Sequence, residues 1–208
     1  MGVREDRKEA TRREIQKAAL DLIESEGLDA VTVARIAERA GISDRTFFRY
    51  FESKEAAAVP GQPELITALV SHQLDASLSP AEIMGRLIEV CRGHLDREVT
   101  QHEFIRISRL LERDPKLLDI VRRQELRLVK ELSRSLTERS VLEPMHGLLV
   151  AELIACTWRV AWERFAREGS TGSRPDPGSM FEEAVSALKE VTAPAAFGAV
   201  PGTKTAHG

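Results

Sequence analysis

A short run of hydroxyl, guanidinium and aromatic side chains lies between residues 43 and 54 of this chain. Ser43, Arg45, Thr46, Arg49 and Tyr50 fall close together in it. Arginine can donate two parallel hydrogen bonds to guanine, and hydroxyl groups and amines bind phosphate oxygens. If residues 44–50 form a short helix with these groups outward, that helix is suited to reading the major groove of DNA.

The residues around this run predict a helix-turn-helix. Thr32 suits the N-cap of a first helix, and Gly41 suits its end, because glycine adopts the left-handed conformation without steric cost. Ser43 suits the N-cap of the second helix, on which Phe47 and Phe51 share one face and pack inward. The apolar side chains of the first helix recur at helical spacing: Val33, Ile36, Ala37 and Ala40.

This segment resembles the DNA-binding domain of TetR-type transcriptional regulators. The sequences AGIS, TFFRYF and SKE stand at the family's spacing, and the resemblance covers residues 10–56. It implies an all-α fold with an N-terminal three-helix helix-turn-helix domain and a C-terminal helical bundle that dimerises through its last two long helices. It also implies a homodimer that binds a palindromic operator in double-stranded DNA and acts as a repressor.

The resemblance also implies which residues contact DNA. Arg45 matches a position that reaches base edges, and Arg49 could read a base or a phosphate. Lys54 matches a lysine that meets phosphate. Thr32 matches a capping position that also contacts phosphate, with capping alone as the alternative. Phe48 replaces the common tyrosine and is suited to a thymine methyl group. The predicted set is Thr32, Ser43, Arg45, Thr46, Phe48, Arg49, Tyr50 and Lys54.

The composition of the chain and the position of its proline residues predict two helical domains. Charged residues make up 30% and aromatic residues 5% of the chain, and its net charge of -3 does not exclude nucleic acid, because the basic groups are local. We expect an arm and helix-turn-helix domain over residues 1–58, an effector-binding and dimerisation domain over 64–192, and a disordered tail over 193–208. Pro60 and Pro63 interrupt the connecting helix, as a hinge or as a loop.

The second domain is expected to consist of amphipathic helices and one helix that is apolar on nearly every side. That apolar helix spans residues 145–168, so one face is predicted to meet the protein's own core and the other a second subunit. Further helices of this domain are expected over residues 80–96, 100–112, 114–139 and 179–191. In the N-terminal domain, the first helix of the chain is expected over residues 8–26.

TetR-like regulators usually hold a ligand inside the C-terminal bundle, so this resemblance implies an effector pocket. Its candidate lining is mostly apolar, which favours a small hydrophobic effector. Residues 110–132 also resemble the mycofactocin-associated subgroup, which implies a fatty acyl thioester. Glu152 is an effector anchor or a member of an ion pair. The candidates are Met84, Leu87, Cys91, His94, Phe104, Ile107, Leu111, Leu126, Leu149, Glu152, Leu153 and Trp158.

Other classes of function find no support in the sequence. No GxSxG, P-loop, CxxC or HExxH pattern occurs, and the five histidines lack metal-ligand spacing, so no enzyme, cofactor or metal site is predicted. The polar N-terminus and the absence of a long apolar segment predict a cytoplasmic protein without membrane contact. Cys91 and Cys156 are expected to be reduced and buried. The alternative function is a ligand-independent DNA-binding or architectural protein whose interior is fully packed.

Overall fold

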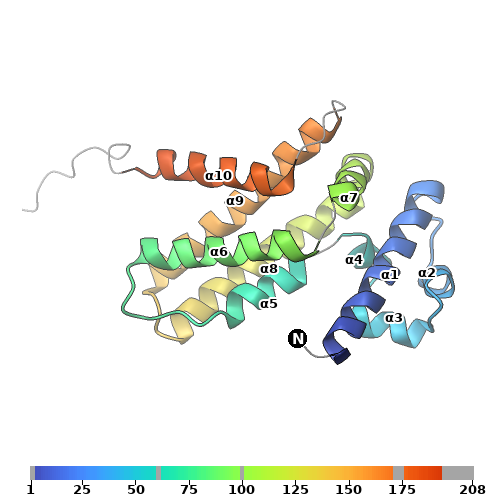
Figure 1. The fold of residues 1–208 in the computed structure, drawn as a ribbon, viewed down its shortest axis with the longest axis horizontal. Coiled ribbons are helices and arrows are strands. Elements are labelled where there is room, and N and C mark those ends of the chain that lie inside the picture. The colour runs from blue at the N-terminus through green and yellow to red at the C-terminus, as the bar shows by residue number, and fades with distance from the viewer. Residues whose placement is uncertain (1–2, 60–61, 99–100, 171–175, 194–208) are drawn as a thin grey trace, which may run out of the picture.

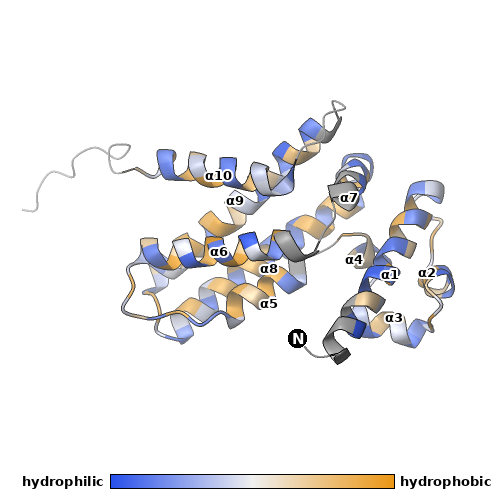
Figure 2. Ribbon diagram, viewed as in Figure 1, coloured by the Kyte–Doolittle hydropathy of each residue, from blue (hydrophilic) through white to orange (hydrophobic). Residues whose placement is uncertain are grey.

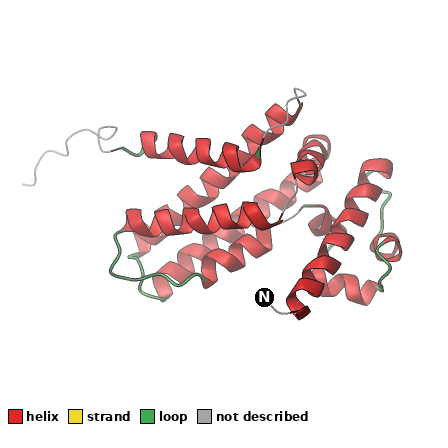
Figure 3. Cartoon of the chain, in the orientation of Figure 1, coloured by secondary structure: helices red, strands yellow, loops and turns green. Residues whose placement is uncertain are grey.

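In the residues that it describes, which are 3–59, 62–98, 101–170 and 176–193, the computed structural model contains helices joined by loops and no strand (Figure 3). This confirms the all-α prediction. The predicted tail lies outside these residues, except for its first position. The helices are α1 (Val3–Glu26), α2 (Val33–Arg39), α3 (Asp44–Tyr50), α4 (Lys54–Ala58), α5 (Gln62–Ser71), α6 (Pro80–Glu98), α7 (Gln101–Arg113), α8 (Pro115–Glu138), α9 (Pro144–Ser170) and α10 (Pro177–Val191).

The helices form two groups, which Figure 1 shows side by side. The helices α1–α4 make up a small group that we call the head, and α5–α10 make up a layered group that we call the body. The helix α4 ends at Ala58 and α5 begins at Gln62, so no continuous helix connects the two groups. Pro60 and Gly61 lie outside the described residues, and a hinge there stays a prediction.

Short-range hydrogen bonds position the two helices of the helix-turn-helix. Thr32 Oγ1 accepts from the backbone N–H of Arg35 at 3.3 Å, and Ser43 Oγ accepts from that of Thr46 at 3.2 Å. Gly41 has a φ of +67°, a conformation that glycine adopts without strain. These caps and this turn are the ones that the sequence predicts.

Two other helix starts differ from prediction. The helix α1 begins at Val3 rather than near residue 8, because Arg4, Glu5 and Arg7 are good helix formers. The helix α10 begins at Pro177, because Asp176 and not Ser179 is its N-cap. At the start of α8, Asp114 caps the helix as expected, accepting from the backbone N–H of Lys116 at 2.9 Å.

Two large hydrophobic cores hold the chain together, one mainly in the head and one in the body, and a small third cluster joins Phe165 and Met180. The head core includes Ile15, Ile36, Phe47 and Phe51, but α7 and α8 also contribute to it. The body core is formed by the facing sides of α5, α6, α8, α9 and α10, which are apolar in Figure 2. The head therefore buries part of its apolar surface against the body. The residues that the body adds to the head core are Ile107, Leu110 and Leu117.

The two cysteines have different environments, and both are free thiols. Cys91 is buried in the body core, and burial raises the pKa of its thiol to about 12. Cys156 is exposed on α9, which contradicts the expectation of burial. The prediction for Cys156 is wrong because its helix is apolar on both faces, so apolar neighbours in sequence do not distinguish the inner face from the outer one.

Candidate nucleic-acid interface

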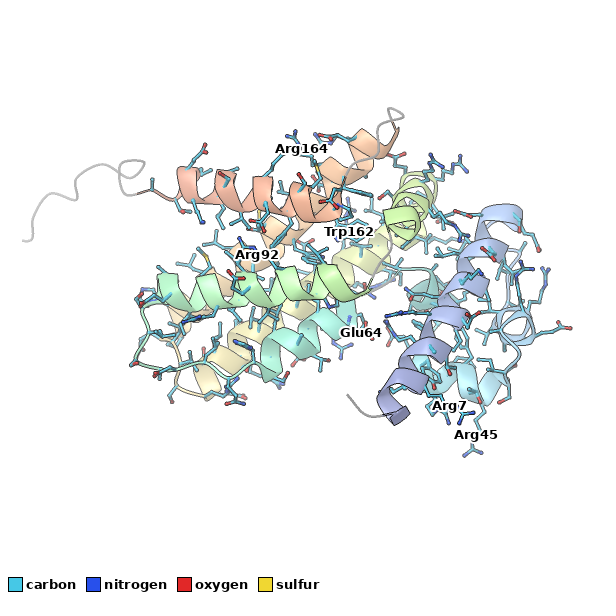
Figure 4. All side chains as sticks on the ribbon, viewed as in Figure 1. Arg7, Arg45, Glu64, Arg92, Trp162 and Arg164 are labelled. Carbon is cyan, nitrogen blue, oxygen red and sulfur yellow. The ribbon has the colours of Figure 1, made fainter. Side chains whose placement is uncertain are left out.

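The helix α3 presents its cationic side to solvent and its aromatic side to the head core. Arg45 and Arg49 are exposed, and Figure 4 shows Arg45 pointing away from the rest of the chain. Phe48 has 58% of its surface exposed, whereas Phe47 has none and Phe51 is buried. The rings of Phe47 and Phe48 meet edge to face at a centroid distance of 5.5 Å. The helix is therefore anchored by its phenylalanines with its arginines available.

The hydroxyl groups of the predicted set lie around the two helix starts. Ser43 Oγ and Thr46 Oγ1 are 3.0 Å apart, and Thr32 is exposed at the start of α2. Tyr50 is half-buried, and the Arg49 guanidinium lies 5.2 Å from the centroid of its ring. Because each hydroxyl group donates one O–H, Thr32 and one member of the Ser43–Thr46 pair can each donate to a phosphate oxygen.

Lys54 has a structural role that the sequence does not reveal. Its ammonium Nζ donates to the backbone carbonyl oxygens of Leu28 at 2.6 Å and Val31 at 2.7 Å. It thereby joins the start of α4 to the loop between α1 and α2. An ammonium has three N–H donors, so one donor remains for a phosphate. These carbonyl groups precede Lys54 by more than twenty residues, so no local pattern could indicate the contact.

We expect Lys54→Ala to destabilise the head as well as weaken DNA binding. Two hydrogen bonds from a charged donor are lost, and the cost is about 1–3 kcal/mol of unfolding free energy. Urea denaturation followed by circular dichroism measures this change. A variant with unaltered stability and weaker binding to all DNA sequences would instead assign Lys54 to phosphate alone.

Ion pairs hold α2 against α1 and thereby support the turn. Arg35 on α2 forms two hydrogen bonds with Glu26, one of them 2.7 Å long, and Arg39 lies 3.4 Å from Asp21. The pKa of Glu26 is lowered, chiefly by the hydrogen bond from Arg35. These arginines are committed to carboxylates of the same domain. The exposed cations of α3 are thus the better candidates for DNA contact.

The body contains a cavity of about 500 Å³ between α7, α8, α9 and the end of α4. Most of its wall is apolar: Val59, Ile107, Leu111, Leu118, Val121, Leu128, Ala155, Trp158, Trp162 and Ala166. A polar band completes the wall: Ser108, Glu112, Arg122, Glu125, Arg159, Glu163 and Arg167. Within that band Arg159 pairs with Glu125 at 3.0 Å and with Glu163 at 3.1 Å, which neutralises its charge.

The cavity overlaps only part of the predicted effector site. Ile107, Leu111 and Trp158 line it as expected. Most other candidates do not line it. Met84, Leu87, Cys91 and His94 belong to α6, whose apolar face packs into the body core. Leu126, Leu149 and Glu152 point outward from α8 and α9, Leu153 is half-buried without reaching the cavity, and the side chain of Phe104 lies outside the described residues.

Two other kinds of site, for a metal ion and for a membrane, find no support in the described residues. They contain no cluster of histidine, cysteine or carboxylate groups that could hold a metal ion. No helix among them combines the length and the apolar character needed to cross a membrane.

Comparison with known proteins agrees with this geometry. Residues 15–56 match the family "Bacterial regulatory proteins, tetR family". The chain is 30% identical to TcmR, an HTH-type transcriptional regulator of Streptomyces glaucescens, over 60% of this chain and 58% of that protein. It is 36% identical to YvdT, an uncharacterized HTH-type transcriptional regulator of Bacillus subtilis, over 35% of this chain and 32% of that protein. The chain thus spans about a third to three fifths of the curated relatives it matches.

Among solved structures, Thermus thermophilus FadR in complex with lauroyl-CoA, a TetR-family repressor, resembles the chain with a TM-score of 0.47 and 22% identity. The aligned region covers 95% of this chain and 99% of that one.

The capped α2–turn–α3 unit, with one buried and one cationic face on α3, defines the chain as a helix-turn-helix protein. Residues 15–56, which contain this unit, are similar to the N-terminal domain of the TetR family of bacterial regulatory proteins. The members of this family that it matches are regulators and not enzymes.

Proposed function

We propose that this protein is a transcriptional repressor that binds a palindromic DNA operator as a homodimer and is released by a small apolar effector. The observation that carries the proposal is the exposed side of α3, which presents Arg45, Phe48 and Arg49 from a rigidly anchored helix of a TetR-family domain. Such a helix fits the major groove. A regulator of this kind works in the cytoplasm, with residues 1–58 as the DNA-binding unit and 64–192 as the effector and dimerisation unit.

The eight predicted residues divide by chemistry into base and backbone contacts. Arg45 and Arg49 carry guanidinium groups that suit guanine, and Phe48 offers an exposed ring to a thymine methyl group. The hydroxyl groups of Thr32, Ser43, Thr46 and Tyr50, with the remaining N–H of Lys54, suit phosphate oxygens.

Arg45→Ala is expected to relax discrimination at one base pair of each half-site. The loss is about 1–3 kcal/mol for the preferred sequence and little for random DNA, because base contacts supply specificity and phosphate contacts do not. Titration of the specific and a scrambled duplex at one salt concentration measures both losses. Equal weakening on the two duplexes would assign Arg45 to phosphate.

The outer faces of α9 and α10 support a homodimer. Met145, Leu149 and Val160 are large apolar side chains that α9 exposes to solvent. A groove of about 350 Å³ between α9 and α10 is lined by Val160, Met180, small residues such as Ala184 and Ala187, and the charged Arg164, Glu183 and Glu190. Exposed apolar side chains beside a groove with small and charged residues suit an interface with an apolar centre and a polar rim.

The cavity supports control by a ligand over the alternative of a ligand-independent architectural protein. A volume of about 500 Å³ lies within the range for small-molecule sites, whereas a constitutive DNA-binding protein needs no internal space. The apolar wall and the internally paired charges favour an uncharged, largely apolar molecule or the tail of an amphiphile. A fatty acyl thioester belongs to the second group and is the first compound class to screen.

Selection of genomic DNA fragments by the purified protein at physiological salt tests the proposed function. A recovered palindrome with half-sites about one helical turn apart, or slightly more, is the expected result. Retention of DNA without sequence preference favours the architectural alternative, and no retention by ligand-stripped protein contradicts both.

A further inference from the structure

Two ionic contacts of arginine, both largely removed from solvent, join the head to the body. The first connects Arg12 of α1 to Glu64 at the start of α5, with Nη2 and Oε2 2.5 Å apart. Figure 4 shows Glu64 on the side of α5 that faces α1. Arg12 is only 7% exposed, and its guanidinium lies 5.2 Å from the ring centroid of Phe51, the C-cap of α3. The buried guanidinium of Arg12 therefore contacts both the body and the C-terminal end of α3, the proposed recognition helix.

The second contact lies farther along α1. Arg106 of α7 donates through Nη2 to Asp21 at 2.6 Å and to Glu24 at 2.7 Å, and its side chain is 14% exposed. The pKa of Arg106 is raised, chiefly by its hydrogen bond to Glu24. A third pair, Lys116 with Asp29, lies in solvent on both sides and contributes little, because exposed ion pairs are screened by water and salt.

The geometry of the Arg12 pair indicates a role in position rather than in stability. Neither Arg12 Nε nor Glu64 Oε2 has a well-aligned hydrogen-bond partner among the described residues. Buried charges are costly to desolvate and repay that cost only with good geometry, so such a pair fixes an arrangement more than it stabilises the fold.

The helix α7 separates the cavity from the head. Its residues Ile107 and Leu111 line the cavity, whereas Arg106 contacts α1 and Leu110 is buried in the head core. The cavity and the head core also share the C-cap of α4 and residues of α8 and α9, so one layer of side chains borders both. The shared residues are Val59, Ile107, Leu111, Val121 and Trp162.

We propose that Arg12 and Arg106 are positioning residues that fix the recognition helix relative to the body, Arg12 as the pivot and Arg106 as the link to the cavity wall. The inference rests on the proposed function. The two contacts on α1 are about 14–18 Å apart, from nine to twelve residues at the rise of a helix. Displacement of α7 by a molecule in the cavity moves one end of α1 while Arg12 holds the other. The head then turns about Arg12, and α3 turns with it through Phe51.

A cavity-filling substitution tests the link without an identified effector. Ala155 lines the cavity and is 2% exposed, so Ala155→Phe places a ring in that space. We expect it to weaken binding to the selected operator about tenfold, a typical coupling between two sites. In an Arg106→Gln background the same substitution should weaken binding less than about threefold.

The matched control is Arg92→Gln. Arg92 of α6 donates two hydrogen bonds to the carboxylate of Glu182 on α10, a comparable ionic contact that is remote from the head. In that background the full weakening should persist. Equal weakening in the Arg106→Gln and Arg92→Gln backgrounds, or none in the wild-type background, overturns the link. Thermal melts identify variants that do not fold, and Ala166→Phe then replaces Ala155→Phe.

The proposed role of Arg12 as the pivot is tested separately, by measuring which spacing between the two operator half-sites the protein prefers. Glu64→Gln should lower the thermal midpoint, because it leaves the buried Arg12 guanidinium without its countercharge. Well below that midpoint, it should bring the affinities for operators lengthened or shortened by one base pair closer to that for the native spacing. An unchanged spacing preference overturns the role of Arg12. Failure of the wild-type protein to bind any DNA specifically instead refutes the proposed function, so the two failures are distinguishable.

Discussion

Phe47→Ala is expected to unfold the head and abolish operator binding. Phe47 is fully buried, and its ring lies 6.0 Å from that of Phe51 and 5.5 Å from that of Phe48. Truncation of a buried phenylalanine costs about 3–5 kcal/mol, a large part of the stability of a small domain. The anchored face of α3 would be lost with it, and the exposed arginines would no longer have a fixed orientation.

Two optical probes separate the head from the body in this experiment. Both tryptophans lie on α9, but Trp162 also packs against the head core, so Trp158 fluorescence in a Trp162→Phe background reports the body, while circular dichroism at 222 nm reports all helices. For Phe47→Ala in urea, we expect part of the ellipticity to be lost before the tryptophan transition. Phe48→Ala is the control, because its exposed ring should change stability by no more than about 0.5 kcal/mol. Equal destabilisation by both variants would contradict the assignment of the two faces.

The helix-turn-helix could be predicted from sequence because its determinants are local. Thr32 and Ser43 bond to N–H groups three residues later, and Gly41 adopts a backbone conformation that depends on its own lack of a side chain. The inward position of Phe47 follows from helical spacing alone. Each of these features needs only the nearest residues, so one sequence suffices.

The cavity could be predicted only in part, because helical spacing shows that a face is apolar but not what covers it. The apolar face of α6, with Leu87 and Cys91, packs against neighbouring helices, whereas Leu126 and Leu149 are apolar residues on outward faces. The true cavity wall includes Trp162 and Ala166, which no residue pattern separates from ordinary core positions.

The charge contacts escaped prediction for a related reason. Lys54 binds carbonyl groups of a distant loop, and Arg12 and Arg106 find their carboxylates on other helices. In a chain with 30% charged residues, many pairs are possible, and only the packing of helices selects among them. Sequence identifies these residues as charged surface, whereas the structure places two of them at the joint between head and body.

Leu149→Glu is expected to dissociate the proposed dimer and with it the binding of a two-part operator. Leu149 is 51% exposed in the single chain, next to Met145 on the outward face of α9. Burial of a leucine is worth about 1.5–3 kcal/mol, and a two-fold interface contains the residue twice. Because Leu149 is 51% exposed, the apolar loss over both copies is about 1.5–3 kcal/mol. The cost of burying two carboxylates raises the total above about 3 kcal/mol, or more than 100-fold in the dimer dissociation constant.

Leu126→Glu is the matched control, because Leu126 is even more exposed but belongs to α8 and not to the α9 and α10 faces proposed as the interface. Analytical ultracentrifugation at micromolar concentration should give monomers for Leu149→Glu and dimers for Leu126→Glu. Binding to a single half-site should be similar for both, whereas binding to the full palindrome should fall about 100-fold or more for Leu149→Glu alone, because the heads are no longer linked. Monomers from Leu126→Glu with dimers from Leu149→Glu would move the interface to α8.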